Sequence, residues 1–191
     1  MGSNIIHISF TLLFLSIFGY YLFQFILVLV KMKQPVLLPV TEEERQGLQL
    51  QMDRKINAPI YRQQKLGIIL ISFIFLFALA LFLWIIFNGD NLFAAAYSLF
   101  LVISTGLTNL INQFAIQRDG ILSGTTFIPW DKVKSFEFIP IDVNHKYFGF
   151  SKEVNHQYEL KIKATCRSVS CIVLTQEMRE KLREELNQHI F

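Results

Sequence analysis

The segment GIILISFIFLFALALFLWIIF, residues 67–87, continues through NGDN at 88–91 into LFAAAYSLFLVISTGLTNLIN at 92–112. Neither apolar run contains Asp, Glu, Lys or Arg, and each is about as long as a helix needs to cross a bilayer. The polar and small residues between them suit a tight turn. The sequence therefore predicts a transmembrane hairpin over residues 67–113, and the positions of all other segments depend on it.

A third apolar run precedes this hairpin. Residues 5–30 contain no Asp, Glu, Lys or Arg, and Lys31 and Lys33 follow them. The run is too long for a signal peptide and no basic residue comes before it, so residues 1–30 are predicted to form a retained first transmembrane helix. Gln24 is its one large polar side chain, for which we expect an interhelical hydrogen bond or an interfacial position, with the lining of a pathway as the alternative.

Small and polar residues predict where the three spans touch. The second span, almost wholly Ile, Leu, Phe and Ala, is expected to face lipid. Gly19, with Ser9 and Ser16 near the same face, is expected to let a neighbouring helix approach the first span closely. In the third span, four residues share one helical face by their spacing and are predicted to pack against another helix: Ser98, Thr105, Asn109 and Asn112.

The distribution of basic residues predicts the orientation. Seven Lys and Arg residues lie in the loop 31–66, whereas the N-terminus and the turn at 88–91 contain none. The positive-inside rule places that loop in the cytoplasm and the N-terminus outside, in a multi-pass protein of the cell membrane. The loop is predicted to be a cytoplasmic connector with one short helix from about Glu42 to Lys55, which Thr41 caps.

Residues 114–191 differ from the spans because alternating apolar and polar residues replace the continuous apolar runs. Asp119-Gly120 indicates a hairpin turn with positive φ angles. In the clearest strand, 158–164, Leu160 and Ile162 are expected to point inward and Glu159 outward. An amphipathic helix from Gln176 to about residue 190 ends the chain. These elements predict a small α+β domain, an antiparallel meander closed by a C-terminal helix.

Two short motifs carry a resemblance. IQRDGI at 116–121, followed by FIPWDKVKSF at 127–136, resembles the opening of bacterial membrane-anchored pleckstrin-homology-like (PH-like) domains. The resemblance covers about the last 80 residues and implies a PH-like domain over residues 114–191, which the predicted topology places in the cytoplasm. Many such proteins have no assigned function, and the resemblance implies no catalytic residue. Trp130 is expected to pack on the Phe-rich core.

The composition bounds the function. Apolar residues make up 52% of the chain, which favours a membrane protein, and the net charge of +3 is too small to indicate nucleic-acid binding. The two cysteines show no metal-ligand spacing, no catalytic motif is present, and no cofactor or metal is expected. An enzyme or a transporter subunit is therefore the least favoured class.

We expect a membrane protein that anchors a PH-like module for protein interaction, with a protein partner or with itself as a homo-oligomer. The alternative is a module that binds anionic lipid or senses membrane stress. Basic side chains that would meet such a lipid surface are Lys146, Lys152, Lys161, Lys163 and Arg167. An ordinary solvated strand face is the competing interpretation of these five residues.

Overall fold

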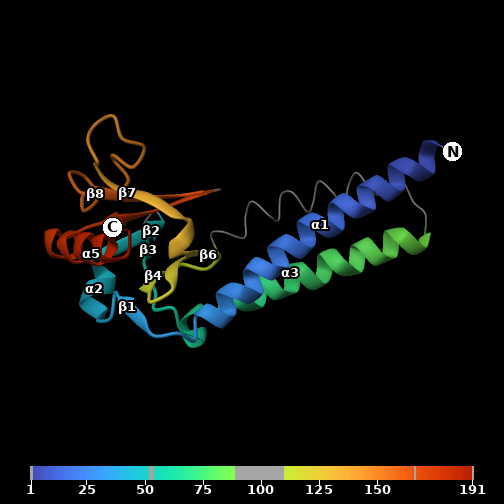
Figure 1. The fold of residues 1–191 in the computed structure, drawn as a ribbon, viewed down its shortest axis with the longest axis horizontal. Helices are drawn as coiled ribbons and strands as arrows, with labels where there is room; N and C mark the ends of the chain where they lie inside the picture. Colours follow the sequence, from blue (N-terminus) through green and yellow to red (C-terminus); the bar gives the residue numbers. More distant parts are fainter. Residues whose placement is uncertain (1, 52–53, 89–109, 166, 191) are drawn as a thin grey trace.

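The computed structural model describes residues 2–51, 54–88, 110–165 and 167–190. Two long helices, α1 (Gly2–Lys31) and α3 (Tyr61–Asn88), lie side by side and extend from a β domain (Figure 1). The N-terminus lies at the far end of the helices and the C-terminus on the β domain. Thr11–Lys31 and Tyr61–Trp84 are long and apolar enough to cross a membrane. Two of the predicted spans are thus confirmed as long apolar helices, whereas residues 92–109 of the third lie outside the described residues.

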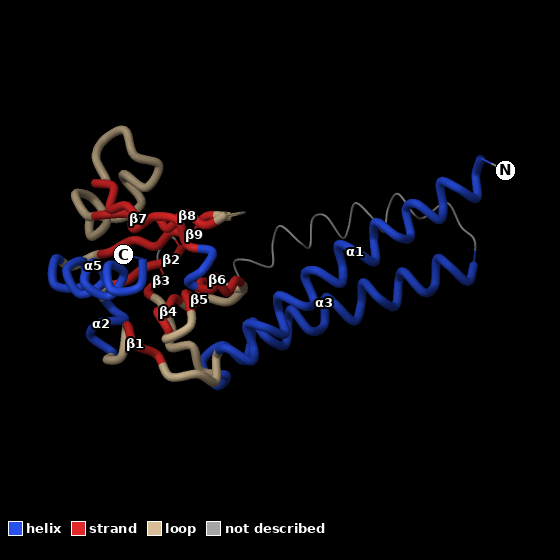
Figure 2. Tube along the Cα trace, viewed as in Figure 1, coloured by secondary structure: helices blue, strands red, loops and turns tan. Residues whose placement is uncertain are grey.

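The β domain contains two antiparallel sheets and three short or medium helical segments (Figure 2). The first sheet has the strand order β1 (Val36–Leu38), β4 (Phe114–Gln117), β5 (Gly120–Ser123), β6 (Thr126–Pro129). The second has the order β3 (Arg54–Lys55), β2 (Leu48–Gln51), β9 (Ser168–Val173), β8 (Tyr158–Ala164), β7 (Val133–Pro140). The helical segments are α2 (Glu42–Gln46), the 3₁₀ turn Trp130–Lys132 and α5 (Gln176–Ile190).

The predicted connector helix is wrong beyond Gln46. Thr41 and Glu44 form the expected capping box, but α2 is only five residues long and ends at Gln46, with Gly47 as its C-cap. The chain then alternates, and Leu48 enters the core opposite Val173 of β9. Tertiary pairing with β9 overrides the weak helical tendency of residues 48–55, because a strand places Leu48 inward with Gln49 on the opposite face. The loop 31–66 therefore supplies strands to both sheets.

The main hydrophobic core lies between the two sheets and α5. It contains Phe114 and Ile116 of β4, Leu160 and Ile162 of β8, and the apolar stripe of α5, Met178, Leu182 and Leu186. These α5 residues recur every three or four positions, which confirms the predicted amphipathic helix. Thr175 caps the helix by accepting a hydrogen bond from the Met178 amide at 3.3 Å.

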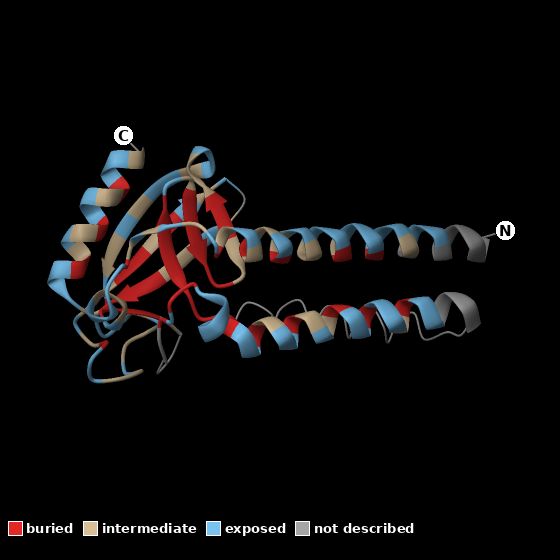
Figure 3. Cartoon of the chain, turned by 90° about the horizontal axis from the view of Figure 1, so that it is seen from below, coloured by how far each residue is buried: buried red, intermediate tan, exposed pale blue. Residues whose placement is uncertain are grey.

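The first sheet is buried on both faces because α1 covers its outer side. Ala115, Leu122 and Phe127 point away from the main core and pack against Val28 and Met32 at the end of α1. All residues of β4 and β5, the two central strands of this sheet, are buried, and buried residues are red in Figure 3. The last turns of α1 are therefore part of the β domain's packing.

The first hairpin turns one residue earlier than predicted. Gln117 pairs with Gly120, so Arg118 and Asp119 form the two-residue turn, and neither has a positive φ. Gly120 is needed for a different reason: a Cβ atom there would lie 2.3 Å from the Ile128 carbonyl oxygen of the neighbouring strand. The next turn does use the left-handed region, at Gly124 with φ +54°.

Aromatic side chains join α1 to α3. Phe14 stacks on Phe82 with 4.2 Å between ring centroids, and Phe18 meets Phe75 edge-on at 5.4 Å. The buried residues of the two helices lie on their facing sides (Figure 3). The prediction of a wholly lipid-facing second span is therefore wrong, since one face of α3 packs on α1.

Among the described residues, the glycine of close approach is Gly67 of α3, and none of them approaches Gly19. A Cβ atom at Gly67 would lie 2.2 Å from the Leu110 carbonyl oxygen, whereas one at Gly19 would meet no described atom within 4 Å. Gly67 thus allows the segment before β4 to cross α3.

Candidate functional site

The predicted helix-packing residues are not all within the described chain. Ser98, Thr105 and Asn109 lie outside it. Asn112 is buried, but Leu110–Gln113 is not helical, so the predicted extension of the third helix to Asn112 is wrong. Its carbonyl oxygen accepts hydrogen bonds from the Asn57 amide at 2.9 Å and the Gln64 side chain at 3.0 Å. Asn112 therefore links the loop 31–66, the start of α3 and the entry to β4.

The five basic residues predicted to meet lipid occupy different places. Lys152 is exposed in the loop between β7 and β8, and Lys161 and Lys163 lie along β8. Lys163 is 3.5 Å from Glu137, and Lys146 is 2.8 Å from Glu159. Arg167, in the turn between β8 and β9, reaches the hydroxyl of Tyr20 on α1. Of the five, Arg167 is the one beside the apolar helices.

Glu159 lies on the opposite face of β8 from Leu160 and Ile162, as predicted, but it is buried there instead of solvated. Only 2% of it is exposed, because the loop 142–157 folds over it and brings His145 within 3.0 Å and Lys146 within 2.8 Å of its carboxylate. Burial raises the pKa of Glu159, but hydrogen bonds from Lys146, Ser170 and His145 and the Lys146 charge together hold that pKa below its usual value. The cluster holds the loop on the sheet.

Replacing this carboxylate should weaken the fold in a pH-dependent way. We expect Glu159→Gln to lower the free energy of unfolding by about 1–3 kcal/mol at pH 7, because it removes a charge that Lys146 and His145 face. Because the pKa of Glu159 is lower in the folded state than its unfolded value of 4.5, the ionised carboxylate stabilises the fold above pH 4.5. That stabilisation is lost as the pH falls through the lower pKa of the folded state. In urea titrations, the difference in the free energy of unfolding between wild type and variant should therefore disappear progressively below about pH 4.5.

The control for this comparison is Glu153→Gln, which removes an exposed carboxylate from the same loop. It should change the free energy of unfolding by less than about 0.5 kcal/mol at either pH. If the difference in the free energy of unfolding between wild type and Glu159→Gln stayed constant from pH 7 to pH 3, the role given to the charge would be contradicted.

A cleft of about 510 Å³ lies between α1 and the β domain. Its α1 wall consists of residues on one helical face: Tyr20, Phe23, Gln24, Leu27 and Lys31. Its opposite wall consists of β6 with the 3₁₀ turn, at Phe127–Pro129 and Lys132, and the turn after β8, at Ala164, Thr165 and Arg167. The cleft thus exists only where the β domain lies against α1.

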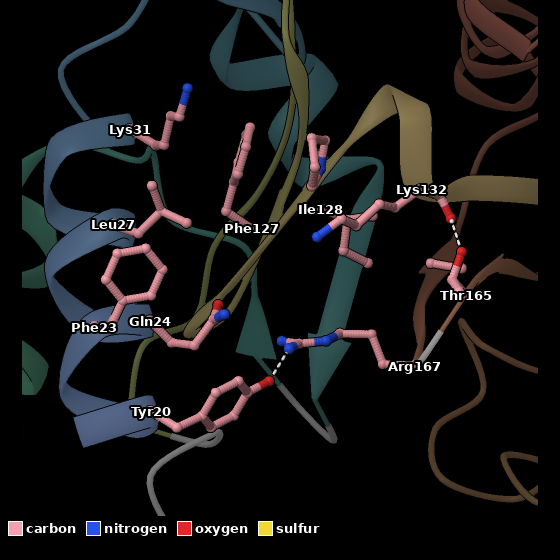
Figure 4. A pocket seen from close by; sticks show the side chains of 12 residues that line it. Tyr20, Phe23, Gln24, Leu27, Lys31, Phe127, Ile128, Lys132, Thr165 and Arg167 are labelled. Atoms are coloured by element: carbon pink, nitrogen blue, oxygen red, sulfur yellow. Dashed lines mark hydrogen bonds between the residues drawn. The ribbon is translucent and has the colours of Figure 1, made fainter. Parts of the chain in front are cut away.

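Lys132 and Arg167 extend into the cleft from the β domain toward α1 (Figure 4). The Lys132 carbonyl accepts hydrogen bonds from the Thr165 amide at 3.0 Å and hydroxyl at 3.4 Å, which joins the two turns that carry these cations. Arg167 also lies over the Tyr20 ring, 5.8 Å from its centroid. Asp, Glu, His and Cys do not occur among the described residues that line the cleft.

Lys31, the last residue of α1, also lines the cleft, but its charge is neutralised by an ion pair. Its ammonium group pairs with Asp119 and lies 4.5 Å from the centroid of the Phe127 ring. Its carbonyl, at the end of α1, accepts a hydrogen bond from the Gln117 side chain at 2.9 Å. Trp130 donates to the Gln117 carbonyl at 3.1 Å and stacks on His189, so it packs at the core edge as predicted.

Sequence reasoning missed Lys132 and Tyr20. The spacing of residues 20, 23, 24, 27 and 31 places them on one face of α1, but that face looks like any other apolar helix surface. The one available signal was Gln24, whose amide oxygen is buried and accepts no hydrogen bond from a described residue. The expected interhelical hydrogen bond is thus absent at this atom among the described residues, and the side chain lines the cleft.

No group of three metal-binding side chains gathers among the described residues. His145 bonds to Glu159, whereas His156 packs edge-on against Phe148 with 6.2 Å between ring centroids. No protein family, characterised protein or solved structure compared with this chain matches it.

Proposed function

We propose that this chain is a non-enzymatic integral membrane protein that holds its β domain, as a binding module, at the cytoplasmic surface of the membrane. The outward faces of α1 and α3 carry the proposal. Large apolar side chains are exposed along both helices, including Leu12 (60% exposed), Phe73 (64%) and Leu76 (67%). Apolar surface of this extent is stable in lipid and costly in water.

The lengths of both helices support a crossing of the membrane. Thr11–Lys31 has 21 residues and Tyr61–Trp84 has 24, which span about 32 and 36 Å at 1.5 Å per residue. A hydrocarbon core is about 30 Å thick, so each helix is long enough to cross it.

The β domain is tied to the ends of both helices, which supports a single side for all its strands. Gln117 binds the end of α1 and Gln64 of α3 binds the Asn112 carbonyl. Because the loop 31–66 contributes β1, β2 and β3, the seven Lys and Arg residues of that loop share a side with the rest of the domain. The positive-inside rule makes that side cytoplasmic.

Cysteine labelling in a chain that carries C166S and C171A tests this orientation. We expect V143C, at an exposed loop position, to react with an impermeant maleimide only after the cytoplasmic side is opened. N88C, at the far end of α3, should react in intact cells, and the protein should stay in the membrane after an alkaline carbonate wash. Reaction of both positions from one side, or release by carbonate, would contradict the proposal.

The PH-like character of the domain and its use for protein contacts or self-assembly stay predictions. The cleft favours the lipid alternative over them, because it joins apolar side chains and two cations next to the membrane helices.

A further inference from the structure

We infer that the cleft between α1 and the β domain binds the phosphate headgroup of an anionic lipid taken from the surrounding membrane. This inference rests on the proposed membrane anchoring and gives that binding module a ligand class. A volume of about 510 Å³ is within the range of small-molecule sites.

The charges of the cleft select an anion. Lys132 and Arg167 have no carboxylate partner among the described residues, unlike Lys31, which pairs with Asp119. Asp131, the sequence neighbour of Lys132, is exposed and is not among the residues that line the cleft. Two unneutralised cations that face one space attract a phosphate, and the planar guanidinium of Arg167 suits bidentate contact with its oxygens.

The apolar wall selects an amphiphile over a free anion. Phe23 and Leu27 line the α1 side, opposite the two cations (Figure 4). An anionic lipid satisfies both walls, with its phosphate against Lys132 and Arg167 and its glyceride portion along Phe23. The buried amide oxygen of Gln24 accepts no hydrogen bond from a described residue, so it suits a hydroxyl donor on the headgroup.

The test measures lipid retention by the purified full-length chain in detergent, using native mass spectrometry with added dioleoyl phosphatidylglycerol or phosphatidylcholine. We expect the wild type to retain phosphatidylglycerol in preference to phosphatidylcholine. The double variant K132Q/R167Q should bind phosphatidylglycerol with an apparent affinity about 30-fold lower than that of the wild type, which corresponds to about 1 kcal/mol for each cation. The matched control K152Q/K161Q removes two lysines outside the cleft and should change the apparent affinity for phosphatidylglycerol less than about twofold.

A charge-preserving variant, K132R/R167K, separates loss of charge from loss of fold and should retain the lipid preference. Equal retention of both lipids by wild type, or unchanged retention by K132Q/R167Q, would overturn the inference. Displacement of phosphatidylglycerol by equimolar inorganic phosphate would also overturn it, by showing an anion site without lipid selectivity. If the chain resists carbonate extraction in such a case, membrane anchoring stands and only the lipid site fails.

Discussion

Residues 114–191 produced alone should not fold cooperatively, although they include the whole segment that resembles a PH-like domain. Such a fragment lacks β1 and β2, which pair with β4 and β9. It also lacks Leu48 and Ile56 of the main core. Each buried aliphatic side chain contributes about 2–5 kcal/mol, so their loss is comparable with the total stability of a small domain. Urea titration followed by far-UV circular dichroism should show no sigmoidal transition.

The control joins residues 33–58 to residues 110–191 through a short Gly/Ser linker. The join is short because the Asn57 amide donates to the Asn112 carbonyl at 2.9 Å, so these two segments are already neighbours. This chain restores all three connector strands and should unfold in one transition. A cooperative transition in the 114–191 fragment, at the same urea concentration as in the control, would show that the connector strands are dispensable.

Gly67→Ala should destabilise the full-length protein, whereas Gly19→Ala should not. A new Cβ atom at Gly67 would lie 2.2 Å from the Leu110 carbonyl oxygen and 3.2 Å from the Ile111 side chain. The nearer atom belongs to the backbone, so the crossing segment has to shift. We expect a net loss of about 1–3 kcal/mol in the free energy of unfolding, even after the gain in helix propensity from glycine to alanine.

Thermal unfolding of both variants in the same detergent measures this difference. At Gly19 no described atom lies within 4 Å of the new methyl group, so no clash with the described residues offsets the propensity gain of up to about 1 kcal/mol. The midpoint should fall for Gly67→Ala and stay level or rise for Gly19→Ala. Equal shifts of the two midpoints would contradict a close crossing at Gly67.

Several elements were predictable from the sequence because local pattern and final environment agree. The apolar runs that became α1 and α3 have no competing pattern. Strand β8 and helix α5 show clean periods of two and of three to four residues, and both bury the expected side chains, Leu160 and Leu182 among them. Where one face is buried and the other solvated, periodicity alone determines orientation.

Other features were decided by partners far away in the chain. Residues 48–51 are a strand because β9 offers an unpaired edge, and β4 is buried on both faces because α1 covers the first sheet. Glu159 is buried on the outward face of β8 because the loop 142–157 closes over it with Lys146 and His145. Residues 48–51 do alternate, as Leu-Gln-Leu-Gln, but four residues are too few to outweigh the capping box that begins a helix just before them.

Of the three apolar helices that the sequence predicted, it placed α1 and α3 correctly, and it also predicted an α+β domain over residues 114–191. Only the tertiary structure decided that the loop 31–66 belongs to that domain, and that the last turns of α1 form one wall of a cleft. The physical reason is that Lys132 and Arg167 lie on separate turns, far in sequence from Tyr20 and Gln24. Their proximity depends on the packing of the first sheet against α1, which no local pattern encodes.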